Sequence, residues 1–337
     1  MDVETNDTLL LNYRDSVTKI ERAVRRATSG GAGMDRAEEL YLQLENQIVE
    51  AARIRSAQRT RIEADIQQRE SDSFACIDIA LELVLTSFRI LDECNEKPPP
   101  NVHYVFSGLL VRTIQVFNEI GALMRAGYGV GARSRWRTLS EIRTVAGVLA
   151  LGGEREALRY KEHRGYLVAR DSLKLYGSAD WDGPGRSAQT FINALSRRFG
   201  ESFCTNYGWA AGLTRRRLGV KRPSWRDVER LIEVSEHKER VLLAHHAVHG
   251  DSVGLLQLVD ASGTFNAGPS AIDVRATLAD ATYLFRQSIN ALLDLWRTHV
   301  ETPRVQAIQL LLDESLLSVT NELLFVYQTR GPDEQAT

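Results

Sequence analysis

The chain has 337 residues, of which 43% are hydrophobic and 26% are charged, and its formal net charge is −2. These values are typical of a globular protein and exclude an overall positive field that would draw the chain onto nucleic acid. The three cysteines are widely spaced and form no CxxC pair, so the sequence suggests neither a disulfide framework nor a thiolate zinc site. No apolar run reaches the roughly 20 residues of a membrane-spanning helix, and the N-terminus has no basic-then-apolar leader. We therefore expect a soluble, cytoplasmic protein without membrane contact.

The N-terminal part is expected to be helical, because the chain has only eight prolines and helix formers such as Leu, Ala, Arg and Glu dominate. We predict one helix over 4–28 and a long second helix over 34–70, whose alternating charges are typical of an exposed surface. The second helix is either a docking arm for a protein partner or simply an exposed helix. A more apolar helix at 73–94 ends at the prolines of 97–101, and the N-terminal helical arm is predicted to end there, at residue 98 (domain 1–98).

The larger part of the chain, residues 101–330, has the pattern of a helical bundle core, and residues 331–337 are expected to be a flexible tail. Apolar residues follow helical spacing, and glycines mark the ends of successive helices. The expected helices are 106–124, 132–151, 154–177, 187–200, 271–300 and 303–328. Residues 205–225 are expected to be irregular, with Ser224 as the N-cap of a further helix that continues to about 236. The predicted fold class is all-α, a helical bundle with a long N-terminal helical arm.

Three of the seven histidines lie within five positions of one another, in the segment 235–254. On a helix of about 100° per residue, His245, His246 and His249 share one face about 100° wide. His245 and His249 have the spacing of zinc ligands, but His246 stands where HExxH has its glutamate and no third ligand is evident. We therefore expect no metal and no cofactor. The face could perform general acid–base catalysis beside an arginine, or it could be a buried polar network that fixes helix packing.

A second polar pair lies on the helix predicted over 132–151. Arg137 and Glu141 are four residues apart, so their side chains can meet on one face. Arg before Glu is the less favourable order for an exposed pair, so surface helix stability explains the pair only weakly. It is either a solvated salt bridge or a polar group held near the bundle core, where it could contribute to a catalytic site.

A third constellation is a basic stretch, TRRRLGVKRPSWR, within the region expected to be irregular. A flexible basic loop with nearby aromatic rings suits binding of phosphates and stacking of bases. It could also be a merely solvated loop, and Asp227 and Glu229 of the next helix partly offset its charge. The residues predicted to contact nucleic acid are Arg215, Arg216, Arg217, Lys221, Arg222 and Trp209.

Four short motifs in residues 100–300 together resemble a family of helical bacterial proteins whose function is unknown. They are Arg137-x-Leu139-x-Glu141, Arg159-Tyr160, Asn206-x-x-Trp209 and the His-Gly-Asp-Ser run at 249–252.

A wider resemblance is to the HEPN superfamily of helical bundles, whose motif is an arginine, four to six residues and a histidine. The segment from Arg240 to His245 fits that motif, and so does Arg240 to His246. The resemblance implies a metal-independent ribonuclease of a toxin–antitoxin or anti-phage system. Val241 departs from the polar residue usual after the arginine. On a straight helix Arg240 points about 160° from Leu242, which puts it opposite the histidine face. A catalytic arginine would therefore more naturally come from Arg137.

Two functions of different classes follow. In the first, the chain is a HEPN-like ribonuclease or RNA-binding effector of a bacterial defence or toxin system. His249 or His245 would act as acid or base, and Arg240 or Arg137, with Glu141 beside it, would stabilise the charge on the phosphate. In the second, the chain is a non-catalytic interaction protein whose histidine face is a buried polar network. We expect a homo-oligomer in either case.

Overall fold

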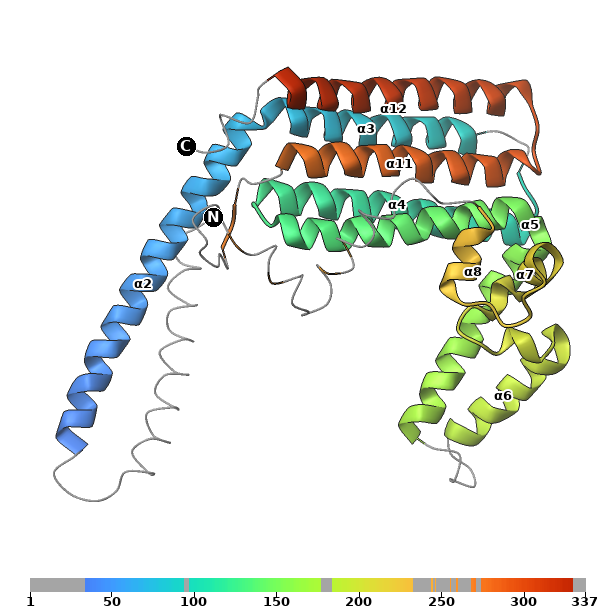
Figure 1. Cartoon of the computed structure of the whole chain (residues 1–337), viewed down its shortest axis with the longest axis horizontal. Coiled ribbons are helices and arrows are strands. Elements are labelled where there is room, and N and C mark those ends of the chain that lie inside the picture. Colours follow the sequence, from blue (N-terminus) through green and yellow to red (C-terminus); the bar gives the residue numbers. More distant parts are fainter. Residues whose placement is uncertain are drawn as a thin grey trace. The chain divides into compact units, whose positions relative to one another are not determined.

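The computed structural model describes residues 34–93, 97–176, 184–232 and 274–329, together with residues 244, 246, 255, 259 and 268–270. Every element in this part of the chain is a helix, which confirms the all-α fold class (Figure 1). The α-helices are α2 (Met34–Arg69), α3 (Ser71–Asp92), α4 (Pro100–Arg125), α5 (Gly129–Tyr176), α6 (Pro184–Phe199), α7 (Ala211–Leu218), α8 (Trp225–Arg230), α11 (Val274–Arg297) and α12 (Pro303–Thr329). Two short 3-10 helices, η1 (Glu201–Phe203) and η2 (Gly208–Ala210), lie between α6 and α7. The helix predicted over 4–28 falls outside the described residues.

The chain divides into two compact units between Ile62 and Glu63. In the first unit, the described side chains of α2 from 52 to 61 are all exposed, as the alternating charges predict. The division falls earlier in the chain than the proline stretch at which the sequence places the end of an N-terminal arm. The reason is that α3 packs against α12 and α11, so its apolar face is part of the bundle of the second unit.

The core of the second unit is formed by α3, α4, the first part of α5, α11 and α12, which lie side by side (Figure 1). Aromatic rings fill its centre: Phe117 stacks on Phe285 with 4.0 Å between ring centroids, and Phe106 meets Trp296 edge-on at 4.8 Å. Between α11 and α12, Arg286 donates two hydrogen bonds to the carboxylate of Asp313, at 2.6 and 2.8 Å. Apolar burial therefore holds the bundle, and this forked ion pair fixes the register of the last two helices.

The long helix α5 changes direction at Gly153, where φ is 65° and ψ is −152°. This is the Gly152-Gly153 break that the sequence predicts, and it starts a second helical segment, Glu154–Tyr176. Glycine is required at residue 153, because this backbone conformation is essentially closed to residues with a Cβ. Helix α5 packs against α4 and α11 in the bundle, and it also packs against α6, η2, α7 and α8.

The region 205–225, expected to be irregular, is in fact largely helical, because it contains η2 and α7. Helix α7 ends at Gly219, whose φ of 71° allows its amide to bond back to the carbonyl of Arg215. The predicted N-cap at Ser224 is confirmed: its side chain and that of Asp227 form a reciprocal capping box at the start of α8. Helix propensity does not predict α7, because this short helix depends on tertiary contacts for its stability.

Candidate functional site

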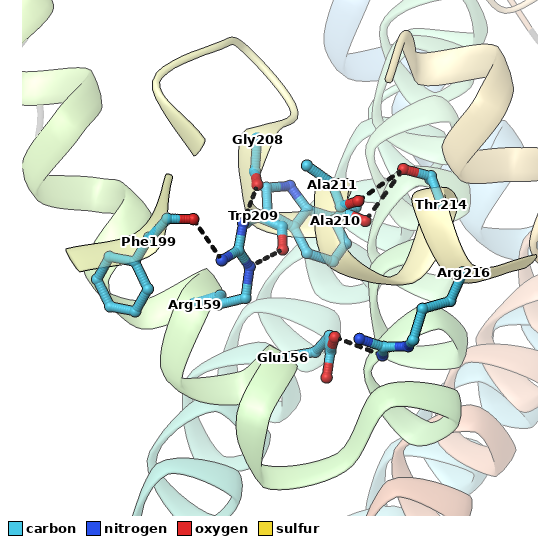
Figure 2. Close-up of polar contacts among 9 residues, drawn as sticks. All are labelled: Glu156, Arg159, Phe199, Gly208, Trp209, Ala210, Ala211, Thr214 and Arg216. Carbon is cyan, nitrogen blue, oxygen red and sulfur yellow. Dashed lines mark hydrogen bonds and ion pairs between the residues drawn. The ribbon is translucent and has the colours of Figure 1, made fainter. Parts of the chain in front are cut away.

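Arg159 is the centre of a buried polar cluster on the second segment of α5 (Figure 2). Its Nε donates to the carbonyl of Trp209 at 3.0 Å, its Nη2 to Gly208 at 2.8 Å and its Nη1 to Phe199 at 3.3 Å. Burial lowers the pKa of Arg159, but a guanidinium with three carbonyl acceptors stays protonated at neutral pH. The side chain is thus a clamp that joins the end of α6 and η2 to α5.

Glu156, one turn earlier on α5, is fully buried and extends this cluster to α7. Its Oε1 accepts a hydrogen bond of 2.8 Å from Nη2 of Arg216, whereas its Oε2 has no hydrogen-bond partner among the residues that the structure describes. The side chain folds back over Gly152, where an added Cβ would lie 2.6 Å from Cβ and Cγ of Glu156. The absence of a side chain at Gly152 therefore leaves room for Glu156, and Glu156 holds the last turn of α7 through Arg216.

Two further residues on the same side of α5 complete the cluster. His163 is buried, and its Nε2–H donates to the carbonyl of Thr205 at 2.8 Å. Burial lowers the pKa of His163 and outweighs this hydrogen bond, so the ring is neutral at pH 7. Tyr160 meets the ring of Trp209 edge-on, with 5.0 Å between centroids, and burial raises the pKa of its phenol. Both side chains serve to position the segment that leads into α7.

The five cations predicted to contact nucleic acid are exposed on α7 and on the turn that follows it. We define the basic surface as seven exposed cationic residues of α7, α8 and the turn between them: Arg215, Arg216, Arg217, Lys221, Arg222, Arg226 and Arg230. Three of them stand in the last turn of α7, where the helix dipole favours positive charge. Arg216 pairs with Glu156 and Arg230 with Asp227, whereas the other five have no carboxylate partner among the described residues. A chain with a net charge of −2 thus concentrates positive charge here.

Trp209, predicted to contact nucleic acid, is buried. Its side chain is only 4% exposed and its ring meets that of Tyr160 edge-on, so little of the ring is open to a nucleotide base. Half-buried rings beside the basic surface are instead those of Tyr207 and Trp225, whose centroids lie 5.6 Å apart at an interplanar angle of 45°. The sequence motif Asn206-x-x-Trp209 therefore marks packing, and Arg170 holds Asn206 through a hydrogen bond of 2.7 Å to its Oδ1.

Arg137 and Glu141 meet as their spacing predicts, with 3.2 Å between Nε and Oε1. Both side chains are partly exposed, at 28% and 45%, so the pair is a partly solvated ion pair on the first segment of α5. Of the two readings of the sequence, the solvated salt bridge describes this geometry better than a polar group sealed in the core.

The predicted catalytic histidines His245 and His249 and the predicted arginine Arg240 lie outside the described residues. Within the segment, only Ala244 and His246 are described: both are helical, Ala244 is buried and His246 is partly buried. In the part of the chain that the structure describes, no group of three or more His, Cys, Asp or Glu side chains could hold a metal ion. Across those same residues, no helix has the length and apolarity needed to cross a membrane.

Sequence reasoning missed Glu156 and His163, although both belong to the central cluster. A signal was present: Glu156, Arg159, Tyr160 and His163 have the spacing of one helix face directly after a Gly-Gly break. Polar residues along one face are usually exposed, so the pattern by itself gave no reason to expect burial. The acceptors of Arg159 are backbone carbonyls, which no sequence pattern reveals.

In a comparison with protein families, residues 103–266 fit the model of a family described as "Family of unknown function (DUF5677)". The match covers just under half of the chain and contains the motifs at Arg137, Arg159, Trp209 and His249. The predicted resemblance to a family of unknown function is thereby confirmed for these residues, while the resemblance to the HEPN superfamily stays a prediction. No curated protein and no solved structure matches the chain.

Proposed function

We propose that the chain is an RNA-binding effector that holds single-stranded RNA on the basic surface of α7 and α8. The observation that carries the proposal is the set of five exposed cations without a carboxylate partner among the described residues: Arg215, Arg217, Lys221, Arg222 and Arg226. Unpaired cations on one surface attract the phosphates of a nucleic acid and release its counterions. An ordinary solvated face would more often carry charges of both signs in pairs.

Rigid support of this surface favours binding, because little conformational freedom is lost when RNA is bound. The Arg159 clamp and the Glu156–Arg216 pair tie η2 and α7 to α5 (Figure 2). Trp225 supplies a partly exposed ring next to the cations, where a base can stack. Stacking on aromatic side chains is tolerant of sequence and contributes about 1–3 kcal/mol per base.

The proposal is tested by binding of a labelled single-stranded RNA to the full chain. We expect R215A/R217A/R222A to weaken binding at least about tenfold, since three phosphate contacts are lost. The control is R53A/R55A/R59A, which removes the same charge from exposed positions of α2 and should change affinity by less than about twofold. Equal losses in the two triple variants would refute a localised basic site.

The narrower form of the proposal is metal-independent cleavage of the bound RNA, within a bacterial defence or toxin system. It is supported by the resemblance to HEPN proteins and by the spacing of His245 and His249, with Arg240 or Arg137 as the cation. The RNA 2′-oxygen would form a bond to the adjacent phosphorus while the bond to the 5′-oxygen breaks, with one histidine taking the proton and another group supplying it. Cleavage in EDTA that is lost in His249→Ala and His245→Ala is the expected result. Binding without any cleavage by the unmodified chain would leave an RNA-binding effector and reject the ribonuclease.

A second candidate, the non-catalytic interaction protein, is favoured by a different observation on α12. Leu310, Leu317 and Leu324 are exposed at intervals of seven residues, at 65%, 37% and 42%, and Leu311 and Phe325 lie beside them. The opposite side of α12 is buried against the bundle. A heptad of exposed leucines is typical of a helix that pairs with another helix, here a second copy of the chain. Mass measurement in solution tests this: Leu317→Glu should give a monomer where the unmodified chain and the control Val168→Glu, on α5, give a dimer.

A further inference from the structure

A groove of about 1080 Å³ lies between α4, the second segment of α5 and the turn at 97–100. Its lining is mostly apolar, and none of the lining residues belongs to the basic surface. Its floor on α4 is formed by Tyr104, Gly108 and Val111, which share one helix face. Tyr104 is 51% exposed, so this groove presents an aromatic ring to solvent. The volume is slightly above the usual range of small-molecule sites, about 300–1,000 Å³.

Positive charge lies along one wall of the groove, on Lys161 and Arg164 of α5. Lys161 donates a hydrogen bond of 3.2 Å to the neutral side chain of Asn101, and its Nζ lies 5.0 Å from the centroid of the Tyr104 ring. Neither Lys161 nor Arg164 has a carboxylate partner among the described residues, whereas Lys97 is already neutralised by Asp92 at 2.7 Å. The groove therefore suits a ligand that brings negative charge to this wall.

Glycine at position 108 makes the room for the flat part of such a ligand. A Cβ built on Gly108 has no heavy atom within 4 Å, so the space next to the Tyr104 ring is open. A flat ring placed there would stack on the tyrosine and bury most of its apolar surface in one contact. A flexible acyl chain would lose rotational freedom and stay partly hydrated, because the groove is open to solvent.

We propose that this groove binds a free mononucleotide, with the base against Tyr104 in the space over Gly108 and the phosphate at Lys161 and Arg164. Ser107 and His103 line the same groove and offer polar atoms to the base edge or the ribose. The site stands apart from the RNA-binding surface proposed above, so either can fail without the other. Its ligand would make the chain responsive to a small nucleotide in addition to RNA.

The test is titration calorimetry of the full chain with each of the four ribonucleoside 5′-monophosphates. At least one should bind saturably, with a Kd on the order of 10–100 µM for a ligand of this size. Adenosine, ribose 5-phosphate and octanoate serve as probes of the base, the phosphate and an acyl anion, and each should bind at least about tenfold more weakly. Octanoate or ribose 5-phosphate binding as tightly as the nucleotide would overturn the assignment, as would the absence of saturable binding.

Substitutions test whether the nucleotide binds in this groove. Gly108→Leu puts a side chain into the open space, where an added Cβ meets no heavy atom within 4 Å, and should weaken nucleotide binding at least about tenfold while the melting temperature holds. Ala75→Leu adds the same side chain at an exposed position of α3 and should leave binding unchanged. K161A/R164A should lose about tenfold, while R215A/R217A/R222A, which tests the RNA surface, should bind the nucleotide normally. Unaltered nucleotide binding by Gly108→Leu would overturn the proposal.

Discussion

Replacing Arg159 with Met tests how the basic surface is held in place, because Met keeps an apolar stem and removes every donor. Two hydrogen bonds of 2.8 and 3.0 Å and a longer one of 3.3 Å are lost. A hydrogen bond to a charged group contributes about 1.5–3 kcal/mol, and a buried carbonyl left without a partner is itself costly. Burial of the guanidinium, which lowers the pKa of Arg159, offsets part of this gain. We expect a net loss of about 3–4 kcal/mol in the free energy of unfolding.

Urea unfolding followed by circular dichroism measures this loss. With an m-value of about 3 kcal/mol/M, the midpoint should fall by roughly 1 M. Arg155→Met, at an exposed position of the same helix, should change stability by less than about 0.5 kcal/mol. Hydrogen exchange should also show faster opening of Cys204–Ala210 in the variant. A loss below about 1 kcal/mol, or unchanged exchange in that segment, would show that Arg159 is not the clamp.

Three further predictions concern pH, backbone and register. Burial lowers the pKa of His163 in the folded state, so the unfolded chain binds the proton more readily. The free energy of unfolding should therefore be highest above about pH 6.5 and decline below it. His163→Gln should lose this pH dependence in unfolding measured from about pH 5 to 8. Gly153→Ala should cost about 1–3 kcal/mol in chemical denaturation, because the alanine must adopt a glycine conformation, whereas Gly108→Ala should be neutral or stabilising. Asp313→Asn should lower the melting temperature by several degrees, because Arg286 loses its forked carboxylate partner. Both side chains are partly exposed, so the loss in the free energy of unfolding should be about 1–2 kcal/mol. No change in calorimetry would argue against a role of this pair in helix register.

Local signals in the sequence were sufficient for the long helices and for several of their ends, but not for α7. The periodicity of 34–70 corresponds to α2, the Gly152-Gly153 break to the change of direction in α5, and Ser224 to a capping box. These features depend on residues a few positions apart, which is the range that helical spacing and capping report. Long-range packing is a different matter: nothing local shows that α3 packs against α12 rather than forming part of an arm.

The candidate site was only partly predictable for the same reason. The cations of 215–222 could be identified from their residue types, but their fixed position depends on Glu156, whose burial follows from contacts 60 residues away along the chain. Trp209 was assigned to base stacking from its type and place, and its burial shows that an aromatic residue beside cations can equally be a packing element. Arg159 was noted as part of a motif, while its role depends on backbone carbonyls 40 to 50 residues away.

The salt dependence of single-stranded RNA affinity tests the central claim, that the basic surface of α7 and α8 binds the RNA backbone. Each phosphate contact on a single strand contributes about 0.7 to the slope of log affinity against log salt concentration. The slope should therefore fall in magnitude by about 2 in R215A/R217A/R222A and stay unchanged in R53A/R55A/R59A. Identical slopes for the unmodified chain and R215A/R217A/R222A would contradict the account.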